Sequence, residues 1–167
     1  MTIQSGFPFT PQLGYNPSNN GDTRNPVRPF VNPAFSGPVV LGQPGQWFNP
    51  QAFVAPQNNS GFFGNLGRDT FTGPGLGTWD FSVMKDTRLT EKLSVQFRAE
   101  IFNLLDRANF NTPNLITAVL LPSVVLNPPT VPPTKSTTVP TLSPAAGAIT
   151  STSTSSRQVQ FGLKLLW

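Results

Sequence analysis

The sequence contains neither cysteine nor histidine. This absence excludes disulfides, thiolate zinc sites, imidazole metal ligands, cysteine nucleophiles and the histidine-assisted catalytic triads. The seven acidic residues are scattered along the chain and do not have the spacing of a calcium-binding loop. We therefore expect no enzyme activity, no catalytic residues, no cofactor and no metal site.

Charged residues are also scarce, at 11% of the chain against roughly 25% in an ordinary soluble domain. The eleven lysine and arginine residues give a net charge of +4, but no three of them are consecutive. No basic-aromatic RNA-binding module is present. The positive charge therefore reflects a shortage of acids, and we expect no nucleic-acid partner.

Long apolar runs are missing as well. No stretch reaches the roughly 18 apolar residues that a transmembrane helix requires. The first ten residues have neither the basic nor the apolar region of a signal peptide. We therefore expect this chain to have no signal peptide of its own.

Proline and glycine, by contrast, are abundant, with 19 and 14 residues. Together with asparagine they predict two long loops, at 11–77 and 105–156. Aromatic residues recur in the first loop and are expected to anchor it. In the second loop, residues 127–155 are low in complexity and are expected to be mobile or disordered. An apolar patch at 116–126 fits either a short extra strand or a buried loop segment.

The C-terminal stretch alternates most clearly between apolar and polar side chains. Odd positions from Val159 to Trp167 are large and apolar, whereas Gln158, Gln160 and Lys164 occupy even positions. This period predicts a strand with one apolar and one polar face. Its length of about ten residues suits a tilted membrane-spanning strand. From this segment alone, the terminal strand of a soluble sheet is an equal alternative.

Similar patterns predict strands at 2–10, 78–89, 92–104 and 157–167. A tight turn at Thr90–Lys92 and two long loops join these strands, which is how outer-membrane barrels are built. If the last strand ends at the periplasmic face, the long loops are extracellular. The predicted fold is all-β: residues 1–167 form the C-terminal antiparallel strands of a transmembrane β-barrel with long, Pro/Gly-rich extracellular loops. About four strands cannot close a barrel, so the chain is expected to be a fragment of that domain.

Several segments resemble one family when taken in order. They are 47–53 (Trp-Phe-Asn-Pro-Gln-Ala-Phe), 64–70 (Gly-Asn-Leu-Gly-Arg-Asp-Thr) with 73–75 and 79–82, 97–104 with 109–111 and 113–114, and the closing 156–164. Together they resemble the C-terminal end of Oar-like TonB-dependent outer-membrane receptors, which often carry an N-terminal carboxypeptidase-regulatory-like domain. The resemblance covers most of 1–115 and 146–167, while 115–146 departs from it and looks like a loop insertion.

The resemblance implies a barrel of about 22 strands with a plug domain and an energising TonB contact. On this reading the chain is a C-terminal fragment or a truncated product, located in the cell outer membrane as part of a full-length receptor. The implied partners are outer-membrane lipid, the barrel-assembly machinery, the rest of the barrel with its plug, and the TonB complex through the missing N-terminal part.

Two groups of site residues follow from this reading. The residues that match the barrel-assembly signal of such proteins are Phe161, Gly162, Leu163, Leu165 and Trp167. The candidate lumen-facing residues are Gln96, Arg98, Glu100, Gln158, Gln160 and Lys164. Arg98 and Glu100 either contact a substrate or, as we favour, hold the lumen wall together. The turn Gly64–Thr70 lacks the Gly-Lys-Ser/Thr ending of a phosphate-binding loop.

The predicted function is therefore the terminal barrel segment of a TonB-dependent transporter, whose outer loops contact the ligand. Siderophores, peptides and oligosaccharides are the ligands that the resemblance implies, and nothing in the sequence selects among them. The alternative is a secreted or surface β-rich adhesive module without transport. By itself the chain is expected to aggregate through its open strand edges.

Overall fold

The computed structural model describes residues 1–22, 27–123 and 137–167, and it divides them into two compact units. The sheet unit consists of Met1–Gly6, Pro74–Asn111 and Ser151–Trp167. The aromatic-core unit consists of Phe7–Gly73 and Thr112–Thr150. The sequence did not predict this division, because both predicted long loops were expected to be connections rather than a compact body.

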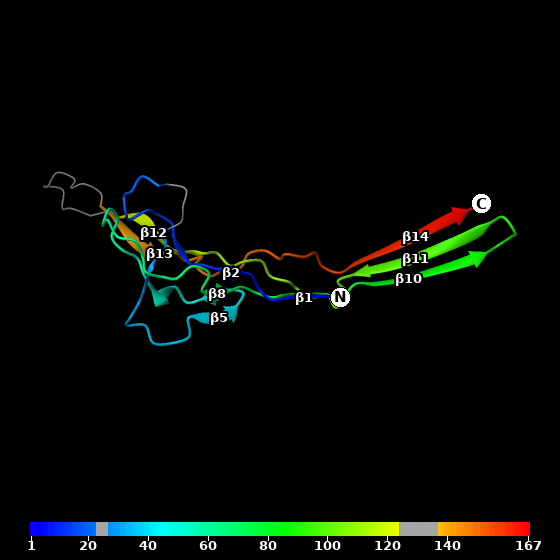
Figure 1. Ribbon diagram of the computed structural model, residues 1–167, viewed down its shortest axis with the longest axis horizontal. Coiled ribbons are helices and arrows are strands. Elements are labelled where there is room, and N and C mark those ends of the chain that lie inside the picture. The colour runs from blue at the N-terminus through cyan, green and yellow to red at the C-terminus, as the bar shows by residue number, and fades with distance from the viewer. Residues whose placement is uncertain (23–26, 124–136) are drawn as a thin grey trace, which may run out of the picture. The chain divides into compact units, whose positions relative to one another are not determined.

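The sheet unit contains the longest strands of the chain. Strands β10 (Phe81–Arg88), β11 (Ser94–Phe102) and β14 (Gln158–Leu166) form an antiparallel sheet in the order β10-β11-β14 (Figure 1). The same unit contains two short strands, β1 (Thr2–Gln4) and β9 (Leu76–Thr78), which pair with each other in antiparallel orientation. The predicted strands near 78–89, 92–104 and 157–167 are thus present and antiparallel.

A three-residue turn joins β10 to β11. The backbone N–H groups of Leu89 and Thr90 both donate to the carbonyl of Leu93, at 2.9 and 3.0 Å. The Thr90 hydroxyl accepts from the N–H of Leu93 at 3.0 Å. A threonine at this position therefore closes the turn that the polar sequence Thr90–Lys92 predicts.

The aromatic-core unit is built mostly from strands of two to four residues, together with one strand of eight residues and one of six. They are β2 (Pro8–Phe9), β3 (Gln12–Leu13), β4 (Phe30–Val31), β5 (Val40–Gln43), β6 (Gln46–Phe48), β7 (Phe53–Val54), β8 (Phe71–Thr72), β12 (Ile116–Ser123) and β13 (Thr137–Leu142). The pairs β2-β8, β4-β7, β5-β6 and β12-β13 are antiparallel, while β3 pairs parallel to β12. One 3₁₀ turn, η1 (Pro50–Ala52), precedes β7, and the Asn49 side chain caps it by accepting from the N–H of Gln51 at 3.0 Å.

Phenylalanine rings hold this unit together. Phe9, Phe48, Phe53 and Phe71 form four ring contacts with centroids 5.9 Å apart, two tilted and two edge-to-face. Phe48 is fully buried at the centre of a cluster that also includes Ala52, Leu66 and Ala146. Tilted and edge-to-face rings satisfy the aromatic quadrupole, and their burial is the main stabilising term of the unit. The expectation that aromatic residues anchor the first long loop is confirmed for this cluster.

The second long loop contributes to the same core. The backbone N–H of Trp47 donates to the Gly147 carbonyl at 2.7 Å, and the backbone N–H of Ile149 donates to the Pro44 carbonyl at 2.8 Å. Gly147 has φ +77, and a Cβ there would lie 2.8 Å from the Phe48 carbonyl oxygen. Only glycine allows the two chain segments to approach this closely.

Two predictions about loops and strands differ from the structure, and a third, left open between a strand and a buried loop segment at 116–126, is decided by it. The strand predicted at 2–10 is two strands, β1 and β2, in different units, because Ser5 and Gly6 interrupt the apolar pattern and Phe9 is drawn into the aromatic core. The patch at 116–126 forms a strand at 116–123. In the stretch expected to be mobile, 137–142 is a strand and Ala146 is buried, while residues 127–136 lie outside the described part of the chain.

Candidate functional site

The three-stranded sheet of the sheet unit separates its side chains into two faces. Residues directly opposite one another in a sheet share a face, and the face changes at every residue along a strand. Phe81 pairs with Ile101, which pairs with Val159, and the same register continues without a break to the turn. One face therefore carries Phe81, Val83, Lys85, Thr87, Val95, Phe97, Ala99, Ile101, Val159, Phe161, Leu163 and Leu165.

This first face is apolar and open to its surroundings. Phe161 and Leu163 are 69% and 70% exposed, and Phe81, Val83, Phe97, Val159 and Leu165 are exposed as well. The rings of Phe97 and Phe161 stack with centroids 6.2 Å apart. A contiguous apolar surface on three neighbouring strands is rare on a soluble domain and marks a surface that another apolar medium covers.

The opposite face is polar. All six candidate lumen-facing residues lie on it: Gln96, Arg98, Glu100, Gln158, Gln160 and Lys164. Gln96 pairs across the strands with Lys164, and Glu100 pairs with Gln160. The structure thus brings these six residues together on one side of the sheet. That this side faces a lumen remains a prediction.

Two polar contacts tie this face together. The Arg98 Nε lies 3.2 Å from the Glu100 Oε1 on the same strand. The Gln96 amide donates to the Asp86 carboxylate at 2.8 Å, which links β11 to β10. Of the two contacts, only Gln96–Asp86 joins neighbouring strands, because Arg98 and Glu100 lie on the same strand. That the Arg98–Glu100 pair holds a lumen wall together remains a prediction.

A few side chains depart from the separation. Lys85 lies on the apolar face opposite Phe97, and Met84, Phe102 and Leu166 lie on the polar face. A lysine among apolar neighbours can keep its charge solvated by extending its four-carbon chain toward a polar boundary. The alternation is therefore incomplete in β10, as its sequence already shows at Met84 and Lys85.

The candidate barrel-assembly residues do not all lie on one face. Phe161, Leu163 and Leu165 lie on the apolar face, whereas Gly162 has the opposite parity and sits across from Arg98. A Cβ on Gly162 would have only ordinary contact with the Arg98 Cβ, at 3.8 Å. Trp167 follows the last residue of β14 and is 93% exposed.

Sequence reasoning missed a buried asparagine next to β11. Asn103 is 5% exposed and has φ +50, a left-handed conformation that asparagine tolerates better than most residues. Its backbone N–H donates to the Asp80 carboxylate at 3.0 Å. Its side-chain amide donates to the carbonyls of Arg107 and Ser155, both at 3.1 Å, and accepts from the Arg107 N–H at 3.1 Å. Asn103 therefore links three segments at the ends of the sheet strands: Asp80 precedes β10, Arg107 follows β11 and Ser155 precedes β14.

Asn109 does the same a few residues later. It is completely buried, accepts from the Gly77 N–H at 2.8 Å and donates to the Thr154 hydroxyl at 3.0 Å. Its own carbonyl accepts from the N–H and the hydroxyl of Ser153 at 2.7 and 3.1 Å. A fully buried amide costs free energy unless it is bonded in this way. Both asparagines belong to the segments that carry the family resemblance, and this was the only signal of their role.

In 1–22, 27–123 and 137–167, no three side chains of the kinds that bind metals come together. Within the same ranges, no helix has the length and apolar character needed to cross a membrane.

Comparison with known proteins gives one match. A family described as an outer membrane beta barrel domain matches residues 1–160, which is nearly the whole chain. No curated protein and no solved structure matches. The match agrees with an all-β fold whose longest strands form an antiparallel sheet with one exposed apolar face and one polar face. The chain therefore belongs to the outer membrane beta barrel domain family and is an outer-membrane β-barrel protein.

Proposed function

We propose that the chain serves as a barrel segment of a TonB-dependent outer-membrane transporter. In this role β10, β11 and β14 are part of the barrel wall, with the apolar face toward lipid and the polar face toward the lumen. The observation that supports this best is the register of the sheet, which gathers most of the exposed apolar side chains on one face and all charged ones except Lys85 on the other. The resemblance to Oar-like receptors supports the finer assignment to TonB-dependent transport.

In this proposal the aromatic-core unit is the extracellular, ligand-contacting part. Its two stretches are the segments on which the barrel reading places the long outer loops. The turn Thr90–Lys92 then lies at the periplasmic side, as does the C-terminal end of β14, since Leu166 pairs with Ser94 beside the turn. The proposal includes the barrel-assembly machinery, the remaining barrel and plug, and the TonB complex as partners, and it includes no enzyme activity.

The orientation of the sheet is testable with single cysteines, because the chain has none of its own. Leu163→Cys on the apolar face should react slowly with a membrane-impermeant maleimide and should be reached by a lipid-borne quencher once labelled. Gln160→Cys on the opposite face should show the reverse. Equal maleimide reaction rates at both positions in native outer membranes would contradict the lipid-facing assignment.

The transport role needs a separate test, one that does not require a known ligand. Culture medium from source cells lacking this gene would be compared by mass spectrometry with medium from cells lacking TonB. Compounds that stay in the medium without this gene should also stay without TonB. If those compounds are consumed normally without TonB, the chain functions without TonB-driven transport, as in a surface adhesive module.

A further inference from the structure

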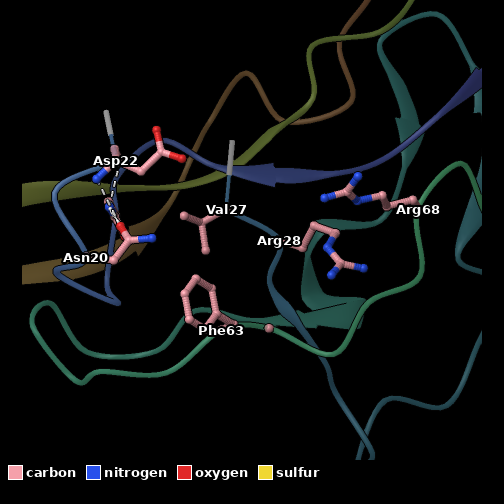
Figure 2. A pocket seen from close by; sticks show the side chains of 8 residues that line it. Asn20, Asp22, Val27, Arg28, Phe63 and Arg68 are labelled. Atoms are coloured by element: carbon pink, nitrogen blue, oxygen red, sulfur yellow. Dashed lines mark hydrogen bonds between the residues drawn. The ribbon is translucent and has the colours of Figure 1, made fainter. Parts of the chain in front are cut away.

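The aromatic-core unit contains a polar cavity that the proposed function does not yet use. Its volume is about 280 Å³ (Figure 2). This is just below the roughly 300 Å³ at which cavities begin to hold drug-sized ligands, so it suits one smaller molecule. Its lining residues come from both ends of the first long stretch: Asn16, Asn20, Asp22, Val27, Arg28, Phe63, Gly64 and Arg68.

Backbone contacts fix the two chain segments that carry the arginines. The Leu66 N–H donates to the Pro29 carbonyl at 3.2 Å, and the Asn65 side chain accepts from the Val31 N–H at 2.9 Å. A Cβ on the buried Gly64 would lie 2.0 Å from the Arg28 carbonyl oxygen. Glycine is therefore required for these segments to lie side by side, and the cavity has a defined wall.

Hydrogen bonds hold the Arg28 side chain and the backbone next to Arg68. The Arg28 guanidinium donates to the Leu66 carbonyl. Beyond Arg68, the N–H of Asp69 donates to the Thr10 hydroxyl at 2.6 Å, and this hydroxyl donates to the Asp69 carboxylate at 3.2 Å. Both guanidiniums lie on the same side of the cavity in Figure 2. Two positive charges are thus presented together by segments far apart in the sequence.

No carboxylate neutralises this pair in the part of the chain that the structure describes. The ion pair between Arg98 and Glu100 involves neither guanidinium. The Asp22 carboxylate also lines the cavity, across from both guanidiniums in Figure 2. An oxyanion beside the two guanidiniums would gain paired N–H···O contacts and the attraction of both charges.

The opposite side of the cavity combines the apolar side chains of Phe63 and Val27 with the polar side chains of Asn20 and Asp22 (Figure 2). Phe63 is 61% exposed, and its ring lies beside Val27 across from the arginines in Figure 2. An exposed phenyl ring offers a flat apolar surface to a ligand ring. The cavity therefore combines an anion-binding end with a ring-binding end at single-molecule size.

We propose that this cavity binds a small ring compound that carries one oxyanion, such as an acidic sugar or a sugar phosphate. The oxyanion lies between Arg28 and Arg68, and the ring packs on Phe63. This binding differs from that of a phosphate loop, because side-chain guanidiniums rather than a Gly-Lys-Ser/Thr backbone turn hold the anion. The assignment deepens the proposed function and rests on it for its biological role as a ligand-selecting site.

The test is direct binding to the full chain in detergent micelles, measured by calorimetry. The probes are glucuronate, glucose 6-phosphate and glucose, which share a ring and differ in the anion. At least one anionic probe should bind at least about tenfold more tightly than glucose, since charged hydrogen bonds add this much. The stronger of the two anionic probes tells a carboxylate source from a phosphate source, and its binding should weaken in high salt.

Arg68→Gln is the main variant, because Arg68 is exposed and its replacement should leave the packing of the unit unchanged. It should weaken the anionic probe at least about tenfold and leave Trp47 fluorescence unchanged. Arg157→Gln removes the same charge from the sheet unit and should bind like the parent chain. Equal binding of glucose and both anions, no binding of any probe, or normal binding by Arg68→Gln would overturn the assignment.

These outcomes are independent of the transport test, because binding in micelles needs no TonB. Loss of the cavity assignment alongside TonB-dependent consumption would leave the transporter proposal intact. Anion binding alongside TonB-independent consumption would reject the transporter proposal and keep the cavity.

Discussion

The two units of this protein differ in whether the apolar side chains on their strands are buried or exposed. In the aromatic-core unit, Phe9, Phe48 and Phe53 are buried against one another although the strands that carry them are two or three residues long. In the sheet unit, Phe161 and Leu163 are exposed although their strand is nine residues long. Regular secondary structure and a buried core therefore do not coincide in this chain.

The difference shows what each unit needs from its environment. The aromatic-core unit buries the rings of Phe9, Phe48 and Phe53 against one another, so this core forms without an apolar medium around it. The sheet unit leaves its apolar face uncovered, so it needs a second apolar medium, which the outer membrane of its family supplies. Substitutions of buried and exposed apolar residues should therefore change the stability of the two units by different amounts.

The largest expected effect is in the aromatic core. Phe48→Ala should lower the free energy of unfolding of this unit by about 3–5 kcal/mol, because a fully buried ring leaves a cavity in contact with Phe9 and Phe53. Urea unfolding followed by Trp47 fluorescence, with Trp79 and Trp167 replaced by phenylalanine, measures it. Phe62→Ala is the control, since Phe62 is exposed and should change stability by less than about 0.5 kcal/mol. Equal losses in the two variants would mean that this unit has no aromatic core.

The next effect is on the apolar face of the sheet. Leu163→Lys should destabilise the membrane-inserted state by about 2–4 kcal/mol, because a charge near the bilayer midplane loses its hydration. Guanidinium titration of the chain in phospholipid vesicles, with Trp167 fluorescence as the signal, measures the loss.

The matched control places the same charge on the other face. Gln160→Lys lies across from Glu100 and should have little effect, and Gln160→Ser should also matter little. Two lysine variants that cost the same would show that the faces do not differ in their surroundings.

A smaller effect is expected where the strands end. Asn109→Ala should cost about 1–3 kcal/mol, because the Gly77 N–H and the Thr154 hydroxyl each lose a buried partner. Amide hydrogen exchange at Gly77 reports this directly and should become faster. Asn109→Asp keeps an acceptor for Gly77 and should protect that amide better than the alanine variant does. Unchanged exchange in Asn109→Ala would show that the side chain is dispensable there.

The smallest effect is a titration in the aromatic-core unit. Burial raises the pKa of Tyr15 from 10.0 to about 12, and its hydroxyl donates to the Pro56 carbonyl. The folded state favours the neutral phenol, so this stabilisation is complete below pH 10 and is lost as the pH rises through about 12. Tyr15 is the one tyrosine of the chain, so absorbance at alkaline pH reports it alone. A midpoint near 10 without denaturant would contradict its burial, while a midpoint near 10 in concentrated urea is expected.

The local patterns carried much of the sheet unit. The alternation in 92–104 and 157–167 predicted two strands, the face of each side chain, and the grouping of Arg98, Glu100 and Gln160 on one side. A period of two is set by backbone geometry alone, so it can be recognised in the sequence without knowledge of any tertiary contact. The polar turn at Thr90–Lys92 could be predicted because it too depends on residues that are neighbours along the chain.

The aromatic-core unit could not be predicted from such local patterns. Most of its strands are too short to show a period, and their partners can be distant: the Thr117 hydroxyl donates to the Gln12 carbonyl at 2.9 Å. Proline and glycine correctly indicated turns, but they also suggested that 137–155 lacked order. Composition reports the absence of regular structure and does not report whether irregular segments bury one another.

The sequence by itself determined the two-faced strands, the tight turn and the lack of cysteine and histidine chemistry, because these depend on neighbours along the chain or on composition. Only the tertiary structure decided that the two long stretches share one aromatic core, that Asn103 and Asn109 hold the ends of the sheet unit together, and that Arg28 and Arg68 line one cavity. Each of these depends on residues separated by tens of positions, and no local pattern encodes which distant partner a buried ring, amide or guanidinium will find.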